Sequence, residues 1–416
     1  MNDEAGIAFS RPPSLVLPKP VEWMLTDGRG IRDGKEFFSN LCDRLVESGV
    51  PLWRANLSAR VLHPQLSAIN LIWRRGAEVE RILREYAMSQ SDAYLNSPIR
   101  VIYEGAAGLR RRLDVPDPHL DFPILGELRA AGATDYVAMA VPDWQGQSAA
   151  LTWASDRPGG FSVADLTLLN DILPLFGLFV ERYKADNIAN NVLHTYLGAQ
   201  TGQRVLHGSI RRGEVEAIHA VLWYCDLRGF TALSDAIPAD ELIELLNAYF
   251  EAVGEPVLTR GGEILKFIGD AMLAIFPLDA ESGRERVGLA MESALEALEN
   301  VAKLNEARKA EGKRVIRLGI ALHVGDVAYG NIGTPARLDF TVIGPAVNKV
   351  VRIEALSKAL DRSLLLSSDF AKACVYPVDS LGFHPLRGIS EPEEIFAPSL
   401  TGREAIVRRA AIRRDN

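Results

Sequence analysis

Residues 217–231 read AIHAVLWYCDLRGFT, an apolar run that ends at Asp226 and is followed by a turn containing Gly229. The run predicts a buried strand, and the apolar spacing between Pro238 and Arg260 predicts a helix after the turn. In a loop between a strand and a helix, backbone N–H groups can point at phosphate oxygens, and glycine allows their close approach. We therefore expect Asp226 at a strand end, beside a loop suited to phosphate.

A second aspartate, Asp270, lies at the bend of a predicted hairpin. Residues 263–276 read EILKFIGDAMLAIF, and Gly269 and Asp270 separate the two strand-like halves. If the hairpin neighbours the first strand, Asp226 and Asp270 meet. Mg²⁺ prefers one or two carboxylates together with phosphate oxygens. The pair therefore predicts a site for divalent cations and a nucleoside triphosphate, although a single aspartate in a turn usually serves the turn itself.

Two further polar residues strengthen this interpretation. Residues 339–356 read DFTVIGPAVNKVVRIEAL, in which Asn348 and Arg352 are four apart on a predicted helix. Residues at this spacing project from one helix face toward one site. Taken alone, they would be an exposed polar residue and a surface partner of Glu354. Taken with the aspartates, they favour phosphoryl chemistry.

Four motifs between residues 216 and 398 resemble the class III nucleotidyl cyclase catalytic domain, the adenylate and guanylate cyclase family. They occur in the family's order, at residues 223–231, 265–276, 325–333 and 339–356. The resemblance implies an α+β, ferredoxin-like catalytic domain. It also implies an adenylate cyclase, in which the ribose 3′-hydroxyl of ATP attacks the α-phosphate to give 3′,5′-cyclic AMP and pyrophosphate.

The resemblance further implies a role for each site residue. Asp226 and Asp270 would hold two Mg²⁺ or Mn²⁺ ions, with a contribution from the Leu227 carbonyl. Asn348 would orient the ribose, and Arg352 would stabilise the α-phosphate in the transition state. The residues expected to contact the phosphates are Leu227, Gly229, Phe230, Thr231 and, from a later loop, Arg387. Asp326 stands where some members of the family have a phosphate-contacting arginine, so we expect that contact to be missing.

The base-recognition positions are Lys266 and Thr341. Lysine has only donors, whereas a threonine hydroxyl can accept. Adenine offers an acceptor at N1 and a donor at N6, and guanine presents the reverse pattern. ATP is therefore the predicted substrate, and guanylate cyclase is an alternative that conflicts with both residues.

In the family, one subunit supplies the aspartates and its partner supplies the base, ribose and transition-state residues. This chain carries both halves, so the resemblance implies a homodimer with two equivalent sites. The alternative from a different class is a catalytically silent cyclase-like module that binds a nucleotide or a partner. Such a module would be expected to lose a metal aspartate or the arginine, and neither Asp226, Asp270 nor Arg352 is lost. We expect His323, the nearest histidine, to be a core residue and no catalytic base.

The first half of the chain predicts a separate α+β sensor domain. Strand-like stretches occur at residues 52–61, 68–75, 99–105, 135–142 and 148–155. A helix is predicted around Phe38 and Leu45, and a long closing helix follows Ser162, a candidate N-cap with Asp165 three residues on. Residues 152–176 resemble the GAF domains of bacterial signalling proteins, which implies a small-molecule ligand. A structural or dimerising domain without a ligand is the alternative.

Five segments follow from these patterns. We predict an irregular leader at 1–34, a GAF-like domain at 35–185, a helical connector at 186–215, a cyclase catalytic domain at 216–398 and a basic tail at 399–416. We expect the first domain to regulate the second through the connector.

Composition excludes some other classes. The net charge of −8 argues against a nucleic-acid surface, which needs concentrated positive charge. The basic clusters at 110–112 and 408–414 are interpreted as a solvated face and a frayed tail. No window offers eighteen uninterrupted apolar residues and no signal peptide is visible, so we predict a cytoplasmic protein without a membrane segment.

Overall fold

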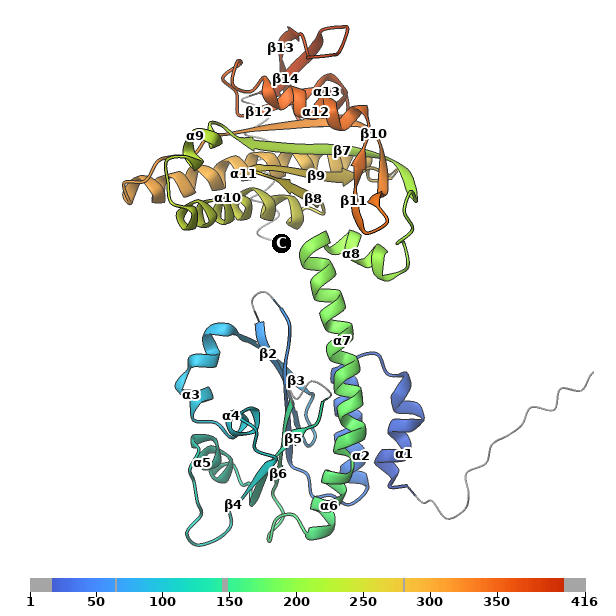
Figure 1. The fold of residues 1–416 in the computed structure, drawn as a ribbon, viewed down its shortest axis with the longest axis vertical. Helices are drawn as coiled ribbons and strands as arrows, with labels where there is room; N and C mark the ends of the chain where they lie inside the picture. The colour runs from blue at the N-terminus through green and yellow to red at the C-terminus, as the bar shows by residue number, and fades with distance from the viewer. Residues whose placement is uncertain (1–16, 64–65, 144–148, 280, 400–416) are drawn as a thin grey trace, which may run out of the picture. The chain divides into compact units, whose positions relative to one another are not determined.

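The computed structural model describes residues 17–63, 66–143, 149–279 and 281–399. It divides the chain into two compact units, residues 1–192 and 193–416, each built around its own sheet (Figure 1). The boundary falls within the connector predicted at 186–215. Both units mix helices and strands, which confirms the α+β prediction.

The first unit contains a six-stranded antiparallel sheet in the order β3-β2-β1-β6-β5-β4. Its strands are β1 (Arg54–Arg60), β2 (Leu66–Arg74), β3 (Glu80–Glu85), β4 (Gly108–Arg112), β5 (Asp135–Val141) and β6 (Ala149–Ser155). Its helices are α1 (Lys19–Leu25), α2 (Gly34–Glu47), α3 (Asp92–Leu95), α4 (Pro98–Tyr103), α5 (Pro123–Ala130), α6 (Val163–Asp171) and α7 (Leu173–Leu197), with short 3₁₀ turns at Asp27–Gly30 and Tyr86–Gln90.

Helices cover both faces of this sheet (Figure 1). Successive strand residues point to opposite faces, so one strand can contribute to the core on each side. In β5, Val137 belongs to the core that α2 and α7 close, whereas Ala138 belongs to the core under α4 and α5. The predicted helix around Phe38 and Leu45 is confirmed as α2, and both residues are buried. The predicted GAF identity of this unit stays a prediction.

The single long helix predicted after Ser162 is wrong in one respect: the segment forms two helices, α6 and α7, bent at the break between them, although the first begins where the sequence predicts. Ser162 caps α6 by accepting from the Asp165 backbone N–H, and the Asp165 carboxylate accepts from the Ser162 backbone N–H in return. This reciprocal capping box satisfies two donors that a helix start otherwise leaves unpaired. Within the described part of the chain, no single helix is long and apolar enough to cross a membrane, although the bent pair α6 and α7 meets that test jointly by length and composition.

Two further local predictions are wrong. Residues 99–105 were expected to form a strand, but they lie largely in α4, because Ser97 caps the helix and Pro98 suits its first position. The leader predicted to be irregular contains α1, whose Trp23 and Met24 are buried. Burial of these two side chains stabilises a helix that composition alone did not indicate.

The first basic cluster is also more than a solvated face. Arg110 lies on β4 and donates to the fully buried carboxylate of Asp135 at 2.6 Å. The two neighbouring ion pairs are Arg111 with Asp121 and Arg112 with Asp114. The cluster therefore fixes the loops around β4. The second cluster, at 408–414, lies outside the described residues.

The second unit contains an eight-stranded sheet in the order β13-β14-β12-β10-β7-β9-β8, with β11 paired to β10. Its strands are β7 (Val215–Leu227), β8 (Glu263–Ile268), β9 (Ala271–Pro277), β10 (Leu318–Thr334), β11 (Arg337–Ile343), β12 (Leu364–Ser367), β13 (Val378–His384) and β14 (Glu393–Pro398). Its helices are α8 (Ala199–Leu206), α9 (Phe230–Ser234), α10 (Ala239–Thr259), α11 (Gly283–Ala310), α12 (Pro345–Ala355) and α13 (Ser368–Ala373).

The long strand β7 contributes side chains to the cores on both faces of the second unit's sheet. Trp223 and Cys225 face the core closed by α10 and α11, whereas Leu222 and Tyr224 face the core closed by α12. The strand pairs antiparallel with β9 and β10 on its two sides. The predicted strand, loop and helix of residues 217–260 are therefore confirmed, as is the hairpin of residues 263–276.

Candidate active site

Two aspartates meet at the ends of neighbouring strands. Asp226 lies near the end of β7, and Asp270 lies in the turn between β8 and β9. Cys225 pairs with Met272 across the two strands, so the next step places Asp226 opposite Ala271, the residue directly after Asp270. Burial, followed by the hydrogen bond and the charge of Asp270, raises the pKa of Asp226 to about 7.

This pair suits a divalent cation. Two carboxylates in contact repel each other unless a proton or a cation lies with them. Among the described residues, no group of three or more His, Cys, Asp or Glu side chains could hold a metal ion. Two carboxylates nevertheless match Mg²⁺, which takes one or two from the protein and the remaining oxygens from water and phosphate. An all-oxygen donor set suits Mg²⁺ or Mn²⁺.

A third acid, Glu354, lies close enough to the two aspartates for their charges to interact. It is buried on α12 and accepts from the Ser357 hydroxyl at 3.0 Å. Burial raises its pKa, and the charge of Asp270 acts in the same direction. A Cβ at Gly319, which lies opposite Asp226 in β10, would come within 2.0 Å of the Glu354 carboxylate. The alternative in which Arg352 forms a surface ion pair with Glu354 is thus wrong, because Glu354 is buried near the aspartates.

The predicted phosphate loop has the expected backbone. Gly229 has φ 76°, a left-handed conformation that favours glycine, and it precedes the first residue of α9, Phe230. The N–H groups of a first helical turn have no acceptor within the helix. Leu227 is buried, Phe230 is half-buried and Thr231 is exposed. A cavity of about 160 Å³ adjoins Leu227 and Gly229.

Arg228 anchors this loop. Its guanidinium donates to the carbonyl oxygens of Ser357 at 2.9 Å and Arg362 at 2.6 Å, just beyond α12. Its backbone N–H donates to the Arg317 carbonyl at 2.8 Å. The loop that follows Asp226 is therefore fixed to the segment that follows α12.

The two base-recognition residues lie on neighbouring strands. Lys266 is on β8, and Thr341 is buried on β11, which contacts β8. The Lys266 ammonium donates to Asp339 of β11 at 2.8 Å. Asp339 and Thr341 are two residues apart and share a face of the strand. Asp339 therefore holds Lys266 toward the strand that carries Thr341, a contact that sequence reasoning missed.

Asn348 and Arg352 lie one turn apart on α12, as predicted. Neither side chain has a hydrogen-bond or ion-pair partner among the residues that the structure describes. The Arg352 guanidinium lies beside Gly388, where an added Cβ would be 3.6 Å away. Arg387, the residue before it, is exposed. The structure thus brings the segment with Arg387 near Arg352.

The contacts within one chain do not connect all of these site residues. In the described ranges, no hydrogen bond or ion pair links the pair Asp226 and Asp270 to Lys266, Thr341 or α12's Asn348 and Arg352. The aspartates contact each other, and Lys266 contacts Asp339 on the strand that carries Thr341.

His323 and Asp326 have the places expected of non-catalytic residues. His323 is buried and hydrogen-bonded to the Ser367 hydroxyl at 2.8 Å, which confirms it as a core residue. Burial lowers its pKa to about 4. Asp326 is exposed, and its carboxylate lies 2.7 Å from His219 Nδ1.

A buried polar network joins the connector to the sheet. The Glu263 carboxylate, at the start of β8, accepts from the Thr201 backbone N–H at 2.9 Å and hydroxyl at 2.6 Å. It also accepts from the Tyr329 hydroxyl at 2.8 Å. Thr201 belongs to α8, and Tyr329 pairs with Val342 of β11. Sequence reasoning missed this network, whose only signal was an acid within an apolar strand.

Part of the second unit matches a known protein family. Residues 215–374 match the family model of the adenylate and guanylate cyclase catalytic domain. The second unit therefore carries a cyclase-type catalytic domain. Its matched residues include both aspartates and the whole of α12.

Individual relatives agree with this finding. An adenylate cyclase of Anabaena cylindrica is 31% identical over 164 residues, which cover 39% of this chain and 32% of that protein. Adenylate cyclase 1 of Rhizobium meliloti is 30% identical over 168 residues, covering 39% of this chain and 24% of the relative. The chain thus spans a third or less of the length of these relatives. The crystal structure of the adenylyl cyclase CyaB from P. aeruginosa aligns with a TM-score of 0.42 and 25% identity over 45% of this chain and 98% of that one.

Proposed function

We propose that this protein is an adenylate cyclase that converts ATP into 3′,5′-cyclic AMP and pyrophosphate. The observation that carries the proposal is the contact between Asp226 and Asp270 within a cyclase-type domain. An acidic pair of this kind is suited to a divalent cation, and a nucleoside triphosphate brings the oxygens that complete the cation's shell. The adenylate cyclases among the relatives support the same reaction.

The chain's own residues position the reacting groups. Asp226 and Asp270 would hold Mg²⁺ or Mn²⁺, which when bound neutralises phosphate charge and lowers the pKa of the attacking hydroxyl. Arg352 donates to the α-phosphate oxygens as charge develops on them, and Asn348 orients the ribose. The loop at Gly229 and the side chain of Arg387 contact the outer phosphates. Catalysis in this scheme is positioning and electrostatic stabilisation.

Adenine is the base that the site favours. Lys266 donates to N1, and the Thr341 hydroxyl accepts from the amino group at N6. Asp339 keeps the Lys266 ammonium beside β11, so the donor and the acceptor stay together. Guanine would meet a donor with its own N1–H and is disfavoured.

The site is completed by a second copy of the chain. Support comes from the lack, among the described residues, of any hydrogen bond or ion pair between the aspartates and the base and transition-state residues of the same chain. Large apolar side chains are also exposed near these strands: Phe267 at 52%, Ile268 at 51% and Ile343 at 50%. Contact with a second copy would remove some of this apolar surface from water, which favours association. In the homodimer, each copy supplies the aspartates of one site and Arg352 of the other.

The first unit regulates the second through the connector. Helix α7 begins in the first unit and continues to Leu197, directly before α8. Thr201 of α8 is tied to Glu263, three residues before Lys266 on the same strand. A shift in α7 would thus reach the base-recognition strand through a buried hydrogen bond.

Product analysis tests the activity. Purified protein is incubated with ATP or GTP in the presence of Mg²⁺ or Mn²⁺, and the product is identified by mass and retention. We expect cyclic AMP from ATP, loss of product in Asp270→Ala, and retention in the matched control Asp326→Ala. Cyclic GMP as the main product would identify a guanylate cyclase, and absence of any cyclic nucleotide under every condition would favour the silent module.

A further inference from the structure

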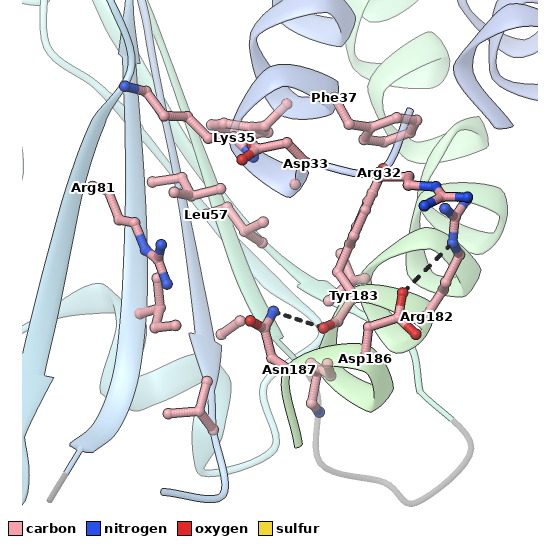
Figure 2. Close-up of a pocket in the computed structure, with 18 of the residues that line it drawn as sticks. Arg32, Asp33, Lys35, Phe37, Leu57, Arg81, Arg182, Tyr183, Asp186 and Asn187 are labelled. Carbon is pink, nitrogen blue, oxygen red and sulfur yellow. Dashed lines mark hydrogen bonds and ion pairs between the residues drawn. The ribbon is translucent and has the colours of Figure 1, made fainter. Parts of the chain in front are cut away.

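The first unit contains a cavity of about 530 Å³ that the cyclase reaction does not use (Figure 2). It lies between α2, α7 and the strands β1 to β3, and all of its lining residues belong to this unit. Its volume falls in the range of sites for small organic molecules. A ligand here would therefore be recognised by the first unit alone.

The floor of this cavity is apolar. Leu57 and Ala59 of β1 point into it, as do Ile69 and Leu71 of β2, because alternate strand residues share one face. From the helices, the apolar lining residues are Phe37, Phe38, Phe176 and Val180. Such a floor favours the hydrocarbon or aromatic part of a ligand.

Three basic residues that line the cavity, Arg32, Lys35 and Arg81, have no ion pair in the described ranges, and the last two flank the floor. Lys35 extends from α2 toward the strands, and Arg81 of β3 faces the cavity from the strand side (Figure 2). Neither has an ion pair or a side-chain hydrogen bond with any residue in the described ranges. Both are exposed, so their charges are available to a ligand that enters the cavity.

The acids that line the cavity are already engaged. Asp33 caps α2 by accepting from the backbone N–H groups of Lys35 at 2.6 Å and Glu36 at 2.9 Å. Asp186 faces Arg182, whose guanidinium also donates to the Arg29 and Ile31 carbonyls. The lining carries five basic residues against these two acids, so its net charge is positive: Arg32, Lys35, Arg81, Arg182 and Lys184.

We propose that this cavity binds an amphipathic carboxylate. The apolar body of the ligand lies on the floor formed by Leu57, Leu71 and their neighbours, and its carboxylate lies between Lys35 and Arg81. Arginine and lysine both bind carboxylates through charge-assisted hydrogen bonds. An inorganic anion would leave the floor uncovered, and an uncharged amphiphile would leave the two cations unpaired.

The competing site is a second cavity of about 420 Å³ on the opposite face of the sheet. It is lined by Ser58 and Asn70, which alternate with Leu57 and Leu71, and by Arg84 of β3. Arg84 is thus a matched control for Arg81, since both are arginines on the same strand beside different cavities.

Calorimetric titration of the full chain with decanoate tests the proposal, with decanol and inorganic phosphate as comparison ligands. We expect decanoate to bind, and Arg81→Gln and Lys35→Gln each to weaken binding by about fivefold or more, as loss of a charge-assisted contact predicts. Arg84→Gln should bind as the parent does. Circular dichroism checks that each variant is folded, and Ala59→Leu, which fills the floor, is a second way to block the cavity.

Three outcomes would overturn the proposal. Decanoate fails to bind, or decanol or phosphate binds equally well, or only Arg84→Gln loses binding. Because calorimetry involves no turnover, each outcome is independent of the proposed cyclase activity.

Discussion

The two units leave opposite charges without a partner. In the first, Lys35 and Arg81 face a cavity with an apolar floor, and basic residues outnumber acids in its lining. In the second, two acids, Asp226 and Asp270, lie against each other at strand ends. The first unit is therefore suited to an organic anion and the second to metal cations.

Buried acids sharpen the comparison. Asp135 in the first unit is fully buried, yet Arg110 and the Phe161 backbone N–H both donate to it. Its charge is balanced within the fold, whereas the charges of Asp226 and Asp270 are not. The balanced acid stabilises the fold, and we propose that the unbalanced pair binds metal ions.

The largest expected effect is the loss of cyclic AMP formation when an acid of the unbalanced pair is replaced. Replacing Asp270 by Asn should lower cyclic AMP formation by about a thousandfold or more, because the cation loses a carboxylate that neutralises the phosphates. The same change should raise the thermal midpoint of the metal-free protein, since a repulsive contact disappears. Rate assays and thermal unfolding, each with and without Mn²⁺, measure both effects. A variant that keeps its activity, or that Mn²⁺ still stabilises as it does the parent, would contradict a metal-binding role for Asp270.

The next effect is on stability. Asp135→Ala should lower the free energy of unfolding by about 3 kcal/mol, because it leaves Arg110 without its partner in a partly buried site. Urea unfolding measures the change. The Mn²⁺-induced thermal shift of the second unit should be unchanged, and loss of that shift would mean that Asp135 is not purely structural.

A pH effect is expected from His323 in the second unit. Its folded pKa, about 4, lies below its ordinary value of 6.5. The unfolded chain therefore binds more protons between these values, so stability is complete above pH 6.5 and is lost as the pH falls toward 4. The slope should reach at most about 1.4 kcal/mol per pH unit. Urea unfolding between pH 7 and 4 should show a shallower slope in His323→Gln; an unchanged slope would assign it to other groups.

The smallest effect concerns Asp339. Asp339→Asn should raise the KM for ATP by about threefold with little change in kcat, because the exposed ion pair with Lys266 positions a donor and takes no part in the chemistry. Steady-state kinetics distinguish the two parameters. Glu216→Gln, which removes another exposed ion pair in the same unit, is the control. A fall in kcat alone would contradict a positioning role.

The sequence predicted those site residues that belong to local patterns. Asp226 ends an apolar strand, Asp270 lies at a hairpin bend, and Asn348 and Arg352 share a helix face. Each placement depends on a spacing within one segment, and each is found in the structure. Which segments become neighbours was harder to infer, because it depends on packing between distant parts of the chain.

The missed residues illustrate this limit. Glu354 reaches the aspartates only because α12 covers β7, and Glu263 meets Thr201 across 62 positions in the sequence. Neither contact has a local signal that names its partner, although Glu263 stands out as an acid within an apolar strand. The error at residues 99–105 has a different cause, since alternating apolar residues favoured a strand while Ser97 and Pro98 began a helix.

Complementation between two inactive variants tests the central claim most directly. Asp270→Ala removes one half of the proposed site, and Arg352→Ala removes the other. Each variant alone should form almost no cyclic AMP from ATP. Mixed in equal amounts, they should regain up to about a quarter to a half of the parental rate per site, since mixed dimers hold one intact site. A mixture as inactive as its two components would contradict a cyclase site shared between two copies of this chain.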